Sequence, residues 1–142
     1  MFKPLSRFSA AVVAVFFLSL LPASIVRADQ VLDWNNTAIE AIKTAKYTSV
    51  KASRALAMTH IAMYDALNSV EQSHRPFYVW LCASPETSPE AAVVAAAHDV
   101  LIGLFPDQSA VLDLALADSL AAIPEGEPKT MGIEIGQIVA ES

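Results

Sequence analysis

Apolar residues recur at helical spacing along almost the whole chain after residue 28. No sustained alternation of apolar and polar residues, the pattern typical of a half-buried strand, interrupts them. The sequence therefore predicts an all-α fold. We expect about five helices, packed as a helical bundle that is part of a larger helical fold: residues 31–46, 50–70, 89–105, 106–122 and 128–142.

Caps and breakers set several of these boundaries. Ser88 can cap the third helix, and Pro89 suits its first turn because a proline lacks only an N–H that is not needed there. The segment between Pro124 and Pro128 is a turn between two breakers. In the last helix, Gly132 and Gly136 each cost about 1 kcal/mol of helix stability. Their spacing of four predicts the close approach of another helix.

The end of the last helix has neither a glycine cap nor a basic residue in its final turn. We therefore interpret the helix as interrupted and the chain as truncated. Residues 29–142 would then be the N-terminal helical region of a longer protein.

The N-terminus has the layout of a secretory signal peptide. Lys3 and Arg7 precede an apolar run over residues 8–21, and a small-residue site follows, with cleavage expected after Ala28. The run is shorter than the roughly 20 residues that span a bilayer. The sequence predicts a signal peptide over residues 1–28, export to the periplasm or the extracellular space, and no membrane association after cleavage.

The charge and the cysteine content of the chain limit the partners and the covalent links that it can have. Loss of Lys3, Arg7 and Arg27 with the signal peptide would change the formal net charge from −6 to −9. An acidic chain without a basic run is a poor nucleic-acid binder. The single cysteine, Cys82, allows no disulfide within the chain. Its apolar neighbours favour a small half-buried side chain over a reactive thiol or an intermolecular bridge.

A long segment over residues 71–88 separates the second and third helices and contains Phe77, Tyr78 and Trp80. A loop of this length is either functional or packed against something. Because apolar rings are costly to leave in water, the three aromatic residues favour packing.

The three histidines show no metal-site pattern. His60, His74 and His98 include no pair at the i, i+4 spacing of a helical site, and Cys82 stands alone. His98 lies on an apolar stripe with Leu101, which favours a hydrogen-bonded core residue over a ligand or a general base. Nucleophile-elbow, phosphate-loop and dinucleotide motifs are absent. The sequence therefore predicts no metal site.

Four stretches together carry a family resemblance. They are VLDWNNTAIEAIKTA (31–45), SRALAMTHIAMYDALNSV (53–70), RPFYVW (75–80) and AAVVAAAHDVLIGLFPDQSAVLDLALADSLAAIPEGEPKTMGIEIG (91–136). Their order and spacing resemble the N-terminal helical part of the bacterial vanadium-dependent haloperoxidases, relatives of the type 2 phosphatidic acid phosphatase superfamily. For a complete family member, the resemblance implies oxidation of halide by hydrogen peroxide at a histidine-bound vanadate, or phosphoester hydrolysis.

That chemistry implies an oxyanion pocket in which cations and N–H donors surround vanadate or phosphate. The family motifs are Lys-x6-Arg-Pro, Pro-Ser-Gly-His and Ser-Arg-x5-His-x3-Asp. The first is incomplete here, because Arg75 and Pro76 are present but the lysine position is Asn68. The second is absent from the chain.

The third motif is matched in part by Ser53, Arg54 and His60, but its aspartate position is Tyr64, with Asp65 one residue late. In a continuous helix Arg54 and His60 are about 240° apart around the axis, so they point away from one another. We expect packing roles instead. Arg54 would bind an acidic group or helix C-terminus of a neighbour, and His60 and Asp65 would form hydrogen bonds that fix the packing register.

The sequence therefore predicts an exported helical segment without catalytic, cofactor-binding or metal-ligating residues of its own. The resemblance implies vanadate only for complete family members. The expected partner is a missing C-terminal helical core or another copy of the chain. The alternative is a free-standing secreted helical module that binds a protein through the aromatic loop and the glycine-marked face of the last helix.

Overall fold

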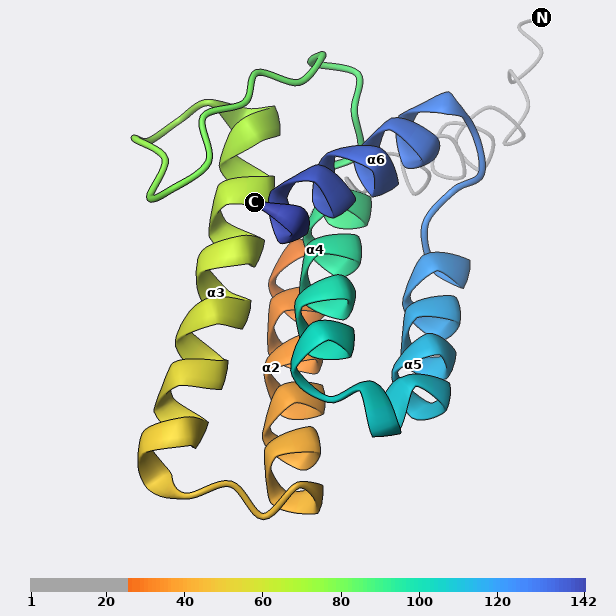
Figure 1. Ribbon diagram of the computed structural model, residues 1–142. Coiled ribbons are helices and arrows are strands. Elements are labelled where there is room, and N and C mark those ends of the chain that lie inside the picture. The colour runs from red at the N-terminus through yellow and green to blue at the C-terminus, as the bar shows by residue number, and fades with distance from the viewer. Residues whose placement is uncertain (1–25) are drawn as a thin grey trace, which may run out of the picture.

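The computed structural model describes residues 26–142, which form α-helices, one short 3₁₀-helix and no strand (Figure 1). The all-α prediction is confirmed. Most of the predicted signal peptide lies outside the described residues, and the predicted cleavage position falls in the first turn of the first described helix. The elements are α2 (Val26–Thr44), α3 (Ser49–Glu71), α4 (Pro89–Leu104), η1 (Pro106–Gln108), α5 (Ser109–Ala121) and α6 (Glu127–Glu141).

Helix α4 begins where its caps predict. The Ser88 side chain accepts a hydrogen bond from the Ala91 N–H at 3.2 Å, and Pro89 occupies the first turn. The prediction of one helix opening at Pro106 is wrong, because residues 106–108 form a 3₁₀ turn. The Gln108 N–H binds the Phe105 carbonyl three residues back, and the α-helix begins only at Ser109.

Helix α4 lies at the centre of the fold, and all four other α-helices pack on it. Residues 91–98 are all buried, and five of these eight are alanines. Small side chains let neighbouring backbones approach closely, so this short helix can be surrounded by partners. In Figure 1, α3 and α5 lie on opposite sides of α4, and α6 crosses over it.

The main core cluster fills the space between α2, α3, α4 and α5. Trp34 of α2, Leu101 of α4 and Leu112 of α5 are its largest fully buried apolar side chains. Burial of each such side chain stabilises the fold by roughly 1.5–3 kcal/mol. A second, smaller cluster joins α3, α4 and α6 through alanines and Val139.

The two glycines of α6 lie directly over α4, as their spacing predicts. A Cβ atom at Gly132 would lie 2.7 Å from the Ala91 Cβ, and one at Gly136 would lie 2.7 Å from the Ala95 Cβ. Both positions also meet backbone oxygens of α4. Only glycine permits this approach, so the conformational cost of glycine in a helix is offset by close packing.

A buried lysine joins the end of α5 to the start of α6. The Lys129 Nζ donates hydrogen bonds to the Leu120 carbonyl at 2.7 Å and to the Glu125 carboxylate at 2.6 Å. A cation at a helix C-terminus stabilises the unpaired carbonyls and the helix dipole. Lys129 therefore fixes where α5 ends relative to α6.

No single helix within residues 26–142 has the length and apolarity to cross a membrane. The segments Pro89–Leu104 and Pro106–Ala121 pass that test only as a pair, and they are bent by 118° at the break between them.

We expect Gly136→Ala to lower the free energy of unfolding by about 1–3 kcal/mol, because the added methyl group overpacks the contact between α4 and α6. Urea denaturation measures the change. Gly103→Ala is the matched control, because a Cβ there has nothing within 4 Å. It removes a helical glycine without a clash and should be neutral or stabilising by up to about 1 kcal/mol. Equal stability changes in the two variants would contradict the close approach.

Candidate functional site

Asp65 holds the long loop after α3. Its side chain is buried, and its carboxylate accepts hydrogen bonds from the backbone N–H groups of Phe77, Tyr78 and Val79 at 2.6, 2.7 and 2.9 Å. A buried carboxylate is costly unless its lone pairs are satisfied. Three backbone donors satisfy it here and fix three consecutive residues of the loop.

Neighbouring residues of α3 hold the same loop at further points. The Asn68 Oδ1 accepts a hydrogen bond from the His74 N–H at 2.8 Å, and the Tyr64 hydroxyl donates one to the Arg75 carbonyl at 2.9 Å. The Ser69 carbonyl accepts from the Ala83 N–H at 2.8 Å. Together with Asp65, these residues occupy one face of α3. That face orders a loop without secondary structure of its own.

The three aromatic side chains of this loop point into solvent. Phe77, Tyr78 and Trp80 are 69%, 66% and 68% exposed, whereas Val79 and Leu81 pack against the second core cluster. The prediction that these rings pack against something is wrong within residues 26–142, where all three are exposed. Backbone hydrogen bonds to α3 anchor the loop instead, so the rings are not needed for its order.

Arg75 contributes a positive charge beside one of these rings. Its guanidinium lies 6.0 Å from the centre of the Trp80 ring, within the range of a cation–π contact. We call Arg75, Phe77, Tyr78 and Trp80 the aromatic surface. Tryptophan, tyrosine and arginine are the residues that most often contribute binding energy at protein interfaces.

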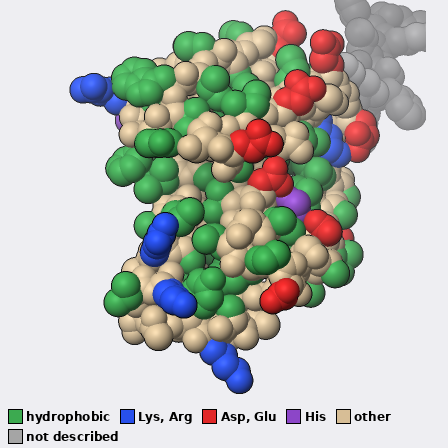
Figure 2. All heavy atoms as spheres, viewed as in Figure 1, with side chains coloured by type: hydrophobic (Ala, Val, Ile, Leu, Met, Phe, Trp, Pro, Cys, Tyr) green, Lys and Arg blue, Asp and Glu red, His purple; other side chains and the backbone are tan. Residues whose placement is uncertain are grey.

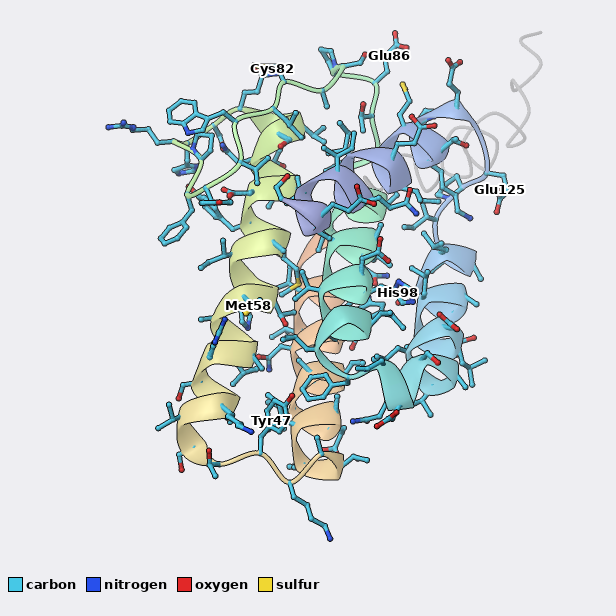
Figure 3. All side chains as sticks on the ribbon, viewed as in Figure 1. Tyr47, Met58, Cys82, Glu86, His98 and Glu125 are labelled. Carbon is cyan, nitrogen blue, oxygen red and sulfur yellow. The ribbon has the colours of Figure 1, made fainter. Side chains whose placement is uncertain are left out.

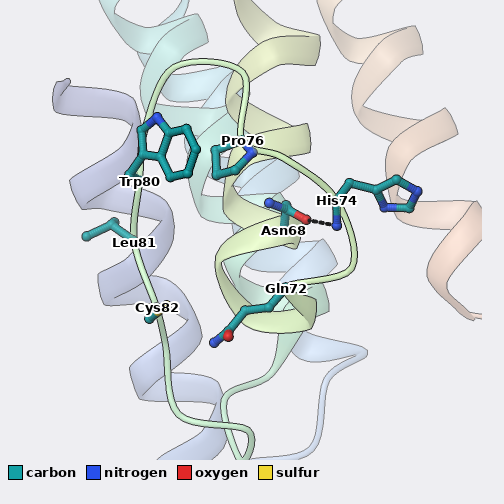
Figure 4. Close-up of a pocket in the computed structure, with 7 residues that line it drawn as sticks. All are labelled: Asn68, Gln72, His74, Pro76, Trp80, Leu81 and Cys82. Carbon is teal, nitrogen blue, oxygen red and sulfur yellow. Dashed lines mark hydrogen bonds between the residues drawn. The ribbon is translucent and has the colours of Figure 1, made fainter.

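A shallow pocket of about 330 Å³ lies under the loop (Figure 4). The His74 ring points away from it, and its Asn68 contact is made by the backbone of His74. Cys82 is exposed at the loop surface (Figure 3), so the prediction of a half-buried thiol is wrong. The lining residues are Asn68, Gln72, His74, Pro76, Trp80, Leu81 and Cys82.

The residues that partly match the oxyanion motifs do not come together. Helix α3 is continuous from Ser49 to Glu71, so Arg54 and His60 point in different directions, as predicted. Arg54 is exposed beside Tyr47 and Lys51 and forms no ion pair with a described residue, so its predicted tie to a neighbour is wrong.

The other two polar residues of α3 do form register-fixing contacts. The His60 Nε2 lies 3.0 Å from the Asn35 Oδ1 of α2, which confirms the prediction for His60. For Asp65 the prediction is correct in kind, but the partner is the loop rather than a helix. Sequence reasoning missed the role of Asn68, whose place beside Asp65 at the end of a helix was the available signal.

His98 is a hydrogen-bonded core residue, as its apolar stripe predicts. Its Nδ1 lies 2.6 Å from the Asp99 carboxylate and its Nε2 lies 2.9 Å from the Asp113 carboxylate (Figure 3). The ring also meets Trp34 edge-on, with 6.2 Å between ring centres. The contact between His98 and Asp113 links α4 to α5.

Among residues 26–142, no group of three histidine, cysteine, aspartate or glutamate side chains is placed to hold a metal ion. No protein-family model, curated protein or solved structure matches this chain. The geometry of the described residues is therefore the basis for a function. Its distinctive feature is a loop whose backbone is tightly held and whose aromatic side chains are exposed.

We expect Asp65→Asn to loosen the loop. An amide has one acceptor oxygen in place of two, and its NH₂ group would face backbone N–H groups from which it cannot accept a hydrogen bond. The loss should be about 1–3 kcal/mol of unfolding free energy. Hydrogen exchange of the Phe77, Tyr78 and Val79 amides should accelerate. Asp33→Asn, at an exposed position of α2, is the matched control. Unchanged exchange at the three amides would contradict the anchoring role of Asp65.

Proposed function

We propose that this chain is a non-catalytic helical docking segment of an exported haloperoxidase-like protein. It would act by presenting the aromatic surface to another protein surface. The observation that carries the proposal is the Asp65 carboxylate, whose three backbone hydrogen bonds order a loop with three exposed aromatic rings.

The order of the loop lowers the entropic cost of docking. A flexible loop loses conformational entropy when it binds, and a loop that is already ordered avoids much of that cost. Burial of exposed rings against a partner removes them from water, and this favours binding. A rigid loop with exposed rings therefore has the properties of a preorganised binding surface.

The non-catalytic part of the proposal is supported by where the cationic and nucleophilic groups lie. Arg75 stacks on Trp80 instead of facing an anion site, and Asn68, at the motif's lysine position, holds the loop backbone. His60 is paired with Asn35. These contacts give each residue a packing role.

The protein should show neither tight vanadate binding nor halide-dependent consumption of hydrogen peroxide. Vanadium NMR line broadening and a peroxide assay with bromide or chloride measure the two properties. A phosphatase assay with a phosphomonoester covers the related chemistry. Submillimolar vanadate affinity, or turnover in either assay, would overturn the non-catalytic proposal.

Family membership has a separate test in the nucleotide sequence that follows the Ser142 codon. We expect a reading frame there that encodes Pro-Ser-Gly-His and a second Ser-Arg-x5-His-x3-Asp. Unrelated sequence after a clean stop codon would contradict the haloperoxidase assignment. The docking role of the aromatic surface would then belong to a free-standing secreted module.

A further inference from the structure

We propose that the aromatic surface of one molecule docks on the outer face of α5 of a second copy. This inference rests on the proposed docking function and names its partner.

The outer face of α5 is apolar and acidic. Val111 and Leu114 are 69% and 63% exposed. They share a helical stripe with Asp118, and Asp107 lies one turn before Val111. Neither aspartate forms an ion pair with another described residue. We call these four residues the acidic surface.

The two surfaces are complementary in charge and in apolar content. The aromatic surface joins three rings to the cation Arg75, and the acidic surface joins two aliphatic side chains to two carboxylates. Rings packed on Val111 and Leu114 would leave Arg75 near Asp107 or Asp118. Such complementarity guides encounter and disfavours contacts between like surfaces.

The described part of the chain is also uneven in charge. Residues 26–85 contain six Lys and Arg residues and five acidic ones, whereas residues 86–142 contain ten acidic residues and one lysine. That lysine, Lys129, is buried. In Figure 2 the basic side chains gather on the side of α3 and the acidic ones on the side of α5 and α6. The face drawn in Figure 2 therefore has a basic side and an acidic side.

The two sides cannot meet within one molecule, because α3 and α5 lie on opposite sides of α4 (Figure 1). The contact is therefore between different surfaces of different copies. Such head-to-tail contacts form rings or open chains instead of a closed two-fold dimer. The three rings expose about 300–500 Å², less than the about 800 Å² per partner of a standard interface. We therefore expect weak, concentration-dependent association.

Sedimentation velocity of the protein as the cell produces it, at low salt and up to about 1 mM, tests the association. Trp80→Ser with Arg75→Glu blocks the aromatic surface, and Leu114→Lys blocks the acidic one. Val50→Ser is the matched control, since Val50 is 81% exposed and belongs to neither surface. Circular dichroism establishes that all variants are folded.

We expect the wild type and the Val50→Ser control to form species larger than dimers, weakened at least about tenfold at 1 M salt, where screening acts over about 3 Å. Each blocked variant should be monomeric. A mixture of the two should form a one-to-one heterodimer, because each retains the surface that the other lacks. This heterodimer distinguishes head-to-tail contact from every symmetric dimer.

Two results would overturn the inference. A monomeric wild type excludes a second copy as the partner. Association that Trp80→Ser with Arg75→Glu abolishes but Leu114→Lys leaves intact places the aromatic surface on a different site. Neither result contradicts the proposed docking function, because a different protein can occupy the aromatic surface. Vesicle binding that depends on Trp80 would identify a lipid surface as the occupant.

Discussion

Helices α4 and α6 are in close contact where Gly132 and Gly136 lie over the alanines of α4. The other described helices pack around this contact. Because α6 lies so close, Val139 reaches the alanines of α3 and closes the second core cluster. At the other end of α6, Lys129 binds the last carbonyls of α5. One close approach between two helices thus positions α3 and α5 on opposite sides of the fold. The loop that follows α3 carries the aromatic surface, and α5 with the preceding 3₁₀ turn carries the acidic surface.

Two buried polar residues hold the elements that carry those surfaces in place. Asp65 and His98 are both costly to bury alone, and each is surrounded by partners that satisfy it: three backbone N–H groups for Asp65, and two carboxylates for His98. Such groups contribute more to a unique geometry than to net stability, because their desolvation cost offsets much of the interaction. Asp65 fixes the loop that exposes the rings, and His98 fixes α5. Both surfaces are therefore preorganised by hydrogen bonds to a buried side chain.

The helices could be predicted from the sequence, but the surface could not. Periodicity, the Ser88 cap and the glycine spacing act within one or two helical turns, and the structure agrees with them closely. The exposure of Phe77 and Trp80 depends on hydrogen bonds between Asp65 and residues 12 to 14 positions away. Hydrophobic patterning predicts that such rings lie in a core. It does not include backbone hydrogen bonds that order the loop without burial of the rings. The failure of the Arg54 prediction has the same origin, since no nearby acidic partner can be read from its helix.

The net charge of the chain does not reveal how the charges are distributed over the fold. The acidic total argues against nucleic acid as a partner, yet it averages over a nearly neutral part, residues 26–85, and a strongly acidic part, residues 86–142. In a fold that joined the two halves face to face, these charges would pair within the molecule. Here α4 lies between the two surfaces, and the side chains of Phe77, Val111 and Leu114 are exposed on the described part of the chain. In the head-to-tail contact that we propose, a second copy covers these surfaces, because one molecule with this topology cannot bring its own aromatic and acidic surfaces together.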